Sequence, residues 1–185
     1  MNEQKHKIFN KVNIFNFFVI VLIFIADRFS KIKIINLVLS DNKSVYINDY
    51  LNLELVWNSG IGFGLLNLDA GIWYHFISLV IFFVILAIIY LIIKSSNMDK
   101  FFLSLVLGGA LGNLYDRVLY FSVPDFIDIH FNDYHWFTFN IADIFISLGI
   151  ILILLNEVFL KKNEKNLHYF LLYFCNYLHY FMHLS

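Results

Sequence analysis

The chain has 185 residues, of which 60% are hydrophobic and only 15% are charged, and its formal net charge is −1. A water-soluble domain of this length needs more charged residues to cover its surface, so the composition indicates an integral membrane protein. A charge this close to zero does not favour a nucleic-acid partner. The single cysteine, Cys175, excludes an intrachain disulfide and a metal site built from several cysteines.

Four apolar segments are long enough to cross a bilayer, which takes about 20 helical residues. They cover residues 12–35, 70–93, 101–121 and 139–160. The first follows three lysines, as the apolar part of a signal peptide does, but no small-residue cleavage motif comes after it. We therefore predict four membrane helices, with the first one retained.

Lysines predict the orientation of these helices. They gather at residues 5–11, 94–100 and 161–165, which fall on one side of a path with four crossings. The loops 37–69 and 122–138 fall on the other side, and they hold several acidic residues but only one basic residue, Lys43. Because lysine and arginine are enriched in cytoplasmic loops, we predict that both termini are cytoplasmic and both loops external.

The external loops are predicted to contain a small β element. Apolar and polar residues alternate over residues 52–57 and 126–131, which is typical of short strands. Residues 58–64 follow the first strand, and their three glycines allow a close approach of backbone to ligand. The predicted fold is an all-α membrane protein, a four-transmembrane-helix bundle with a small extracytoplasmic β element.

Residues 1–165 make up this membrane domain, and residues 166–185 form an aromatic tail. Tyrosine and phenylalanine suit the headgroup boundary, so the tail is either an interfacial helix or a segment without a role.

Three aspartates occur within or at the ends of the apolar segments: Asp27, Asp116 and Asp143. At 1.5 Å per residue each lies about 24 to 27 Å from the lysine at the cytoplasmic end of its helix, near the outer boundary of the hydrocarbon. A carboxylate in this environment is expected to face a protein interior and is a candidate for function. Asp27 and Lys31 have i,i+4 spacing, so they are expected to neutralise each other and to anchor the end of the first helix at the lipid–water interface.

The other two aspartates each have an amide three residues earlier on the same helical face. We expect Asn113 to orient Asp116 and Asn140 to orient Asp143, and we expect Arg117 to pair with Asp116 as a fixed charge. In the same segment, Gly108 and Gly112 form a small-xxx-small pattern that allows close helix packing.

A fourth aspartate, Asp125, follows Pro124, the only proline, just beyond the third apolar segment. It is expected at the same boundary as Asp143. Two carboxylates that converge in a medium of low dielectric constant cannot both ionise at little cost, so one keeps a proton. The pair can then act as base and acid toward a water molecule, which is the arrangement for aspartic peptide hydrolysis.

Five motifs in this order resemble those of the lipoprotein signal peptidases (signal peptidase II). They are Asp27-x-x-x-Lys31, Asn58-x-Gly60, Gly108–Arg117, Val123–Phe126 and Phe139–Asp143. The resemblance implies that Asp125 and Asp143 are the catalytic dyad, although the family usually has an apolar residue, often valine, where Pro124 stands. It also implies supporting or substrate-binding roles for a further set of residues: Asn58, Gly60, Asn113, Asp116, Arg117, Asn140 and Ala142.

By the same resemblance the chain is an aspartic endopeptidase that cleaves diacylglyceryl-modified prolipoproteins before the lipidated cysteine. No metal and no other cofactor is expected. The expected location is the bacterial cytoplasmic (inner) membrane, with the active site near the outer face. Its partners are then its prolipoprotein substrates and membrane lipids, and it is expected to act as a monomer.

Other interpretations of the acidic residues remain open from the sequence. In a small proton- or ion-coupled transporter subunit the acids would relay charge, but they would then be spread through the membrane depth. Asp116 competes with Asp125 as the second carboxylate of the pair. Asp128 and Asp133 are expected to be ordinary loop acids, and the spacing of His179 and His183 is expected to be a surface feature and not a metal site.

Overall fold

The computed structural model describes residues 10–41, 44–60, 72–132 and 134–159. Its four helices are α2 (Lys11–Asp41), α3 (Ile72–Lys94), α4 (Asn97–Tyr120) and α5 (Ile141–Phe159). Its four strands are β1 (Val45–Asn48), β2 (Leu51–Asn58), β3 (Val123–Phe131) and β4 (Tyr134–Phe139). The tail 166–185, with His179 and His183, lies outside the described residues, as do Asp133 and the glycine-rich residues 61–64.

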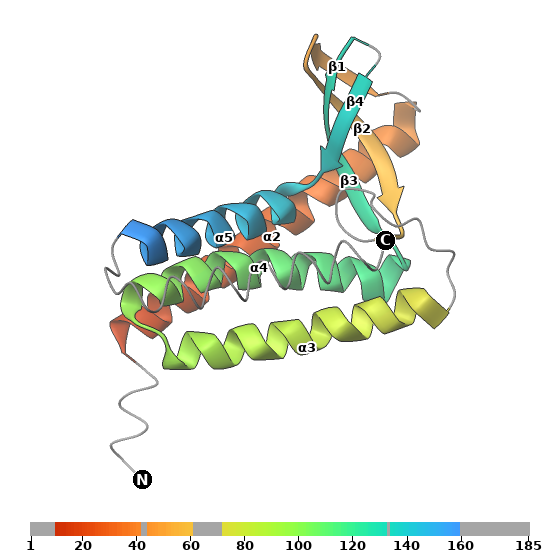
Figure 1. Cartoon of the computed structure of the whole chain (residues 1–185). Coiled ribbons are helices and arrows are strands. Elements are labelled where there is room, and N and C mark those ends of the chain that lie inside the picture. Colours follow the sequence, from red (N-terminus) through yellow and green to blue (C-terminus); the bar gives the residue numbers. More distant parts are fainter. Residues whose placement is uncertain (1–9, 42–43, 61–71, 133, 160–185) are drawn as a thin grey trace.

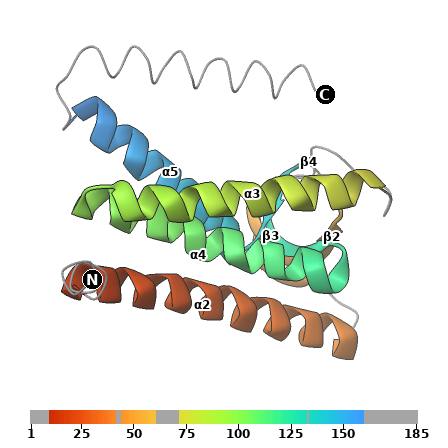
Figure 2. The ribbon, with the colours of Figure 1, turned by 90° about the horizontal axis from the view of Figure 1, so that it is seen from below.

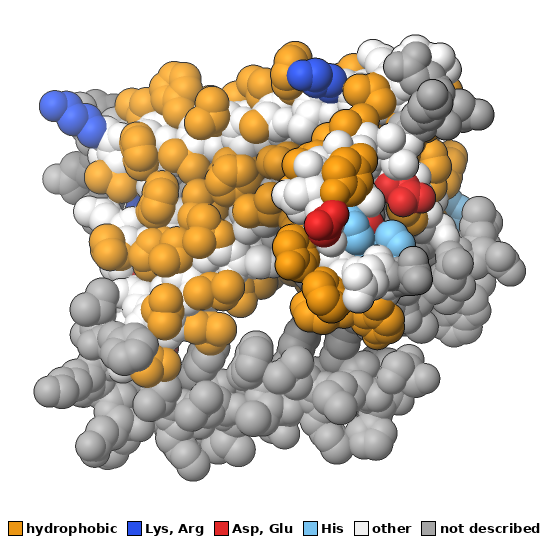
Figure 3. Space-filling model, turned by 90° about the horizontal axis from the view of Figure 1, so that it is seen from above, with side chains coloured by type: hydrophobic (Ala, Val, Ile, Leu, Met, Phe, Trp, Pro, Cys, Tyr) orange, Lys and Arg blue, Asp and Glu red, His pale blue; other side chains and the backbone are white. Residues whose placement is uncertain are grey.

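Within the part of the chain that the structure describes, three helices are long and apolar enough to cross a membrane. These spans are Lys11–Ser40, Tyr74–Lys94 and Ile141–Val158. The fourth predicted span falls on α4, which is less apolar and lies at the centre of the bundle, in contact with α2, α3 and α5 (Figures 1 and 2). The apolar side chains of the bundle cover its surface in the view of Figure 3, as expected for helices that face lipid.

Glycines bring α4 close to its neighbours, as the sequence predicts. A Cβ atom on Gly108 would lie 2.9 Å from the Cβ of Ile23 on α2. One on Gly109 would lie 2.8 Å from Cγ1 of Ile146 on α5. Since neither space admits a methyl group, these two contacts depend on glycine.

The strands form one antiparallel sheet in the order β1-β2-β3-β4. The predicted strands at residues 52–57 and 126–131 are confirmed as parts of β2 and β3. The sequence pattern does not predict β1 and β4. β1 has only four residues, and β4 is exposed or half-exposed along its whole length, so neither carries a clear alternation. The sheet projects from one end of the bundle, and the α3–α4 link lies at the other (Figure 1), so the two long connections share one end as predicted.

The first helix continues past its predicted end at residue 35 and ends at Asp41. Asp27 therefore lies in the middle of α2, and its side chain is fully buried, with 0% exposure. The prediction that Asp27 and Lys31 anchor a helix end at the lipid–water interface is wrong. Their polar atoms are satisfied inside the protein, so nothing at this point requires the helix to stop.

A charge cluster of Asp27, Arg28, Lys31 and Asp116 joins α2 to α4. Nζ of Lys31 lies 2.9 Å from Oδ1 of Asp27 and 2.7 Å from Oδ2 of Asp116. Nη2 of Arg28 donates to Oδ2 of Asp27 at 2.7 Å and to Oδ2 of Asp116 at 2.6 Å, and its Nη1 donates to Oδ1 of Asp116. The predicted pairing of Asp27 with Lys31 is confirmed. Two carboxylates and two cations leave the charge cluster neutral.

The partner of Asp116 differs from the one that the sequence suggests. Arg117 points away from it: its Nη2 donates to the backbone oxygen of Gly60, and its guanidinium lies over the ring of Tyr74 at 5.4 Å from the centroid. The prediction of an Arg117–Asp116 pair is therefore wrong. Neighbouring residues on a helix point in directions about 100° apart, so Arg28 on the facing helix has the better approach.

The cost of losing one member of the charge cluster follows from its burial. Asp27 and Asp116 are 0% exposed and Lys31 is 1% exposed, so water cannot replace a missing partner. Removing one partner from a buried ion pair leaves an uncompensated charge and typically costs about 3–5 kcal/mol.

We expect Arg28→Gln to destabilise the fold, and Asp116→Asn in the same chain to recover part of the loss, because the second change removes the charge left unpaired. The coupling should be about 1–3 kcal/mol, the range for residues in one ion-pair network. Unfolding of the two single variants and the double variant in detergent micelles measures this value. Arg117→Gln combined with Asp116→Asn is the control, and its coupling should be smaller than that of the Arg28 pair, because Arg117 donates to Gly60 and not to Asp116. Additive effects for Arg28, or equal coupling for Arg117, would contradict the assignment.

Candidate active site

Asn140 orients Asp143 at the start of α5. The backbone N–H of Asp143 donates to Oδ1 of Asn140 at 3.1 Å, and the backbone N–H of Asn140 donates to Oδ2 of Asp143 at 3.2 Å. This reciprocal pair is a capping box, with Asn140 as the N-cap residue. The expected orientation of Asp143 by the amide three residues before it is confirmed.

The same amide holds Asp125. Nδ2 of Asn140 donates to Oδ1 of Asp125 at 2.6 Å, and Nδ2 of Asn58 donates to Oδ2 of Asp125 at 2.9 Å. Asn58 ends β2 and is paired in register with Val123 of β3, which places it beside Asp125. Asp125 is thus a buried strand residue, 2% exposed, and not a loop residue, and Asn140 stands between it and Asp143. We call Asp125 and Asp143 the aspartate pair.

Asn113 connects the aspartate pair to the charge cluster. Its Nδ2 donates to Oδ1 of Asp143 at 2.8 Å, and its Oδ1 accepts from Nζ of Lys31 at 2.9 Å. The expectation that Asn113 orients Asp116 is wrong. Its amide reaches across to α5 because α4 lies between α2 and α5.

The remaining predicted residues support the same site from two sides. The backbone N–H of Ala142 donates to Oδ1 of Asp27 at 3.1 Å and ties the first turn of α5 to the charge cluster. The backbone N–H of Gly60 donates to Oδ1 of Asn58 at 2.9 Å, and the oxygen of Gly60 accepts from Arg117. The structure therefore brings the predicted residues into one connected network. Arg28 is the member that the sequence analysis lacked, although its place one residue after Asp27 in an apolar run was a usable signal.

Burial raises the pKa of Asp125 to about 6, and the nearby charge of Asp143 contributes to this rise. The amide hydrogen bonds from Asn58 and Asn140 act in the opposite direction, but they do not outweigh burial. A carboxyl group with such a pKa holds and releases a proton near neutral pH, which suits acid–base chemistry.

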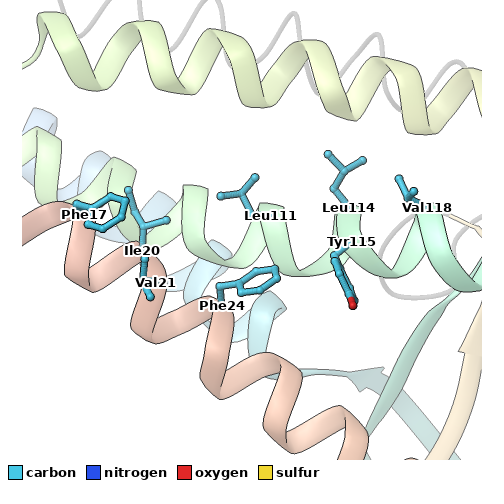
Figure 4. Close-up of a pocket in the computed structure, with 8 residues that line it drawn as sticks. All are labelled: Phe17, Ile20, Val21, Phe24, Leu111, Leu114, Tyr115 and Val118. Atoms are coloured by element: carbon cyan, nitrogen blue, oxygen red, sulfur yellow. The ribbon is translucent and has the colours of Figure 1, made fainter.

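An apolar trough of about 330 Å³ opens beside Asp143. Apart from Asp143 and Ser147, the residues that line it are apolar: Phe139, Ile144, Leu148 and Ile151. A larger groove of about 500 Å³ lies between α2 and α4 (Figure 4), but none of its lining residues is acidic. Of these two hollows, only the trough on α5 is lined by a residue of the aspartate pair, Asp143.

The prediction that Asp128 is an ordinary loop acid is wrong. It is a residue of β3, only 2% exposed, and its carboxylate contacts His130 and His135. Among the described residues these three form the one group with the side chains and spacing of a metal site. They lie on the sheet and share no hydrogen bond with the aspartate pair.

Known proteins match most of the chain. The family model described as "Signal peptidase (SPase) II" covers residues 19–159. A protein named lipoprotein signal peptidase from Pelagibacter ubique (strain HTCC1062) is 45% identical over 165 residues, which cover 85% of this chain and 99% of that protein. One of the same name from Francisella tularensis subsp. novicida (strain U112) is 39% identical over 152 residues, 80% of this chain and 94% of that protein.

A solved structure titled "Bacterial membrane enzyme structure by the in meso method at 2.3 A resolution" has the same fold, with a TM-score of 0.65 and 28% sequence identity. The match covers 80% of this chain and 92% of that one. The family match spans α5, most of α2 and everything between them, and so includes every residue of the aspartate pair and of the charge cluster. The chain belongs to the signal peptidase II family.

Proposed function

We propose that this protein is an aspartic endopeptidase that removes signal peptides from diacylglyceryl-modified prolipoproteins, with Asp125 and Asp143 as its catalytic residues. The observation that carries the proposal is the aspartate pair itself: a buried carboxylate, Asp125, and a half-buried one, Asp143, from different elements, both held by Asn140. The side-chain amide of Asn140 donates to Asp125, and its backbone N–H donates to Asp143. Membership of the signal peptidase II family and relatives named lipoprotein signal peptidase support the substrate class.

In the proposed reaction the aspartate pair carries one proton and holds a water molecule. The ionised carboxylate takes a proton from the water as its oxygen attacks the carbonyl carbon of the scissile bond. The protonated carboxyl donates its proton to the carbonyl oxygen, which becomes a hydroxyl of the tetrahedral intermediate. When the intermediate collapses, its nitrogen gains a proton from the protonated carboxyl, the C–N bond breaks, and one hydroxyl proton of the intermediate passes to the ionised carboxylate. This leaves a new carboxyl group, the free amino group of the lipidated cysteine, and the pair with one proton as at the start. The pKa of Asp125, raised by burial to about 6, brings this carboxyl into the range in which it can take up and release a proton.

Asn58, Asn113 and Asn140 act as positioning residues in this proposal. Each donates an amide N–H to one oxygen of the aspartate pair, which fixes the direction of the remaining lone pairs. Fixed donors and acceptors lower the reorganisation needed at the moment of reaction. Arg117 serves indirectly, because its bond to the Gly60 oxygen holds the chain next to Asn58.

The apolar trough supports a substrate that approaches from lipid. Asp143 lies in its wall, and five side chains of α5 and the adjoining end of β4 supply the rest. A diacylglyceryl cysteine is anchored by two acyl chains, so its scissile bond is held near the headgroup level. We propose that α4 is a fourth membrane span, that both termini are cytoplasmic, and that the aspartate pair works near the outer face of the bacterial cytoplasmic membrane. We also propose that the protein acts as a monomer.

A small proton- or ion-coupled transporter subunit is not favoured. Transport needs acids spread along a path through the membrane. Here Asp27 and Asp116 both pair with the same two cations, and Asp125 and Asp143 both accept a hydrogen bond from Asn140. The acids thus form one connected group instead of a relay.

We expect Asp125→Asn and Asp143→Asn each to lower turnover of a lipidated prolipoprotein by at least about 100-fold, because the amide keeps the size and the hydrogen-bonding oxygen but cannot exchange the proton. Purified variants are assayed by cleavage, and their thermal unfolding is recorded to verify that they fold. Glu54→Gln, an exposed carboxylate of the same sheet, is the matched control and should retain full turnover. Near wild-type turnover in either aspartate variant would rule out the aspartate pair as catalytic.

We expect a cysteine at Ser44 to react with a membrane-impermeant thiol reagent in intact cells, and a cysteine at Ser96 to react only after the membrane is opened. Both positions are exposed and they lie at opposite ends of the bundle. The background is Cys175→Ser, which removes the single native thiol. The reverse labelling pattern would place the aspartate pair at the cytoplasmic face.

We expect a diacylglyceryl-modified precursor peptide to be cleaved far faster than the same peptide with an unmodified cysteine. The lipid holds the scissile bond at the depth of the aspartate pair, so less orientational freedom is lost in the transition state. Cleavage rates are compared in detergent at equal peptide concentration. A third peptide, whose cysteine is alkylated but carries no acyl chains, shows whether any difference comes from the lipid anchor or only from blocking the thiol. Equal rates on all three peptides would refute the role of the lipid anchor.

A further inference from the structure

The exposed end of the β3–β4 hairpin gathers three side chains that the proposed reaction does not use. Asp128 and His130 are two residues apart on β3, so they point to the same face of the sheet. His135 of β4 is the cross-strand partner of His130 and joins them on that face. Nδ1 of His135 lies 2.7 Å and Nδ1 of His130 lies 3.3 Å from Oδ2 of Asp128. Histidine and acidic side chains lie together on the surface of the sheet in Figure 3.

We propose that Asp128, His130 and His135 bind one divalent transition-metal ion of the Zn²⁺ class. Two imidazole nitrogens and one carboxylate oxygen are a ligand set that suits such ions, with a fourth position left for water or another ligand. The three ligand atoms lie within 4.8 Å of one another. Such a site departs from the sequence-based expectation that the protein has no metal site.

Unpaired polar atoms distinguish this group from a simple ion pair. Asp128 is 2% and His130 is 8% exposed, and among the described residues neither Oδ1 of Asp128 nor Nδ1 of His130 makes a hydrogen bond. A buried polar atom without a partner costs about 1–3 kcal/mol. Nδ1 of His130 therefore lies near the carboxylate of Asp128 without a hydrogen bond to it. Two atoms that bind the same metal ion are arranged in this way.

The spacing of the ligand atoms agrees with this interpretation. With metal–ligand bonds of about 2.0–2.2 Å, neighbouring atoms in a tetrahedral site lie about 3.3 Å apart. The His130–Asp128 separation already has this value, 3.3 Å. The His135–Asp128 separation has to widen from 2.7 Å, and the side chain of His135 is 53% exposed and free to rotate.

Asn52 supplies the outer contact that a metal-bound histidine needs. A histidine bound through Nδ1 carries its proton on Nε2, and that N–H normally donates to a carbonyl or carboxylate. The side-chain amide of Asn52 lies 3.5 Å from Nε2 of His130, and its Oδ1 is buried without a hydrogen-bond partner among the described residues. Rotation of this amide by half a turn brings Oδ1 to the Nε2–H and satisfies both atoms.

The ion would join the two strands that lead into the active site. Asp128 is three residues after Asp125 on β3, a distance of about 10 Å along a strand, and β4 ends one residue before Asn140. The expected consequence of binding is a more stable hairpin. The metal lies apart from the reacting atoms, so its binding can be tested without a cleavage assay and independently of the proposed function.

The test is Zn²⁺ binding to the full chain, purified in detergent, stripped with EDTA and freed of the chelator. Isothermal titration is expected to give one strong site per chain, which Mg²⁺ in excess does not occupy, and Zn²⁺ is expected to raise the midpoint of thermal unfolding. His135→Gln and Asp128→Asn should each weaken this site at least tenfold and abolish the shift in midpoint. Because His135 is an exposed side chain, its variant is expected to unfold at the wild-type midpoint without metal.

The matched control is the double variant His179→Gln, His183→Gln, which removes the other pair of histidines with metal-type spacing. It should bind Zn²⁺ like the wild type. Two results would overturn the proposal: unchanged affinity in His135→Gln, or loss of the site in the control. A Co²⁺-loaded wild type should also show the intense visible bands of a low-symmetry four-coordinate site, and bands that persist unchanged in His130→Gln would likewise overturn it.

Discussion

The charge cluster is the interaction on which the rest of the structure depends. Four charged side chains from the middle of α2 and the C-terminal half of α4 lie together, with three of them buried and Arg28 12% exposed, and their charges cancel. In an apolar bundle without water, none of them can be buried alone, so α2 and α4 have one register in which all four are paired. Gly112 enforces this register, because a Cβ at that position would lie 2.5 Å from Oδ2 of Asp27. Close backbone packing and charge neutralisation thus require the same alignment of the two helices.

That alignment carries through to the aspartate pair by two direct links. Lys31 also donates to Asn113, whose amide then reaches Asp143, and Asp27 also accepts the backbone N–H of Ala142 in the first turn of α5. The sheet completes the arrangement from the other side, since Asp125 on β3 accepts both from Asn58 at the end of β2 and from the amide of Asn140. A rigid pair of helices therefore orients one carboxylate and a paired strand orients the other, which is how a site can hold two acids close together.

Apolar periodicity, lysine placement and short motifs predict much of this architecture: the helices, the end of the bundle that carries the sheet, and the residues of the site. They do not predict contacts between charges on different helices. Asp116 lies next to Arg117 in the sequence, yet its partner is Arg28, because helix geometry turns adjacent side chains apart. Asn113 shares a helical face with Asp116 but bonds to α5. Asp128 looks like a loop acid until the pairing of β3 with β4 places two histidines beside it. These pairings depend on tertiary packing, which no local pattern contains.

The two sets of carboxylates differ in the kind of partner that they have: one set contacts cations, and the other accepts hydrogen bonds from neutral groups. Asp27 and Asp116 each contact two cations, so their charge is compensated within the charge cluster. The hydrogen-bond partners of Asp125 and Asp143 among the described residues are neutral amide and backbone N–H groups. A neutral donor orients a carboxylate without fixing its charge, which leaves the pair able to take up and release a proton. The partners of the aspartate pair thus leave its charge free to change, because the charges of the neighbouring charge cluster are paired with one another.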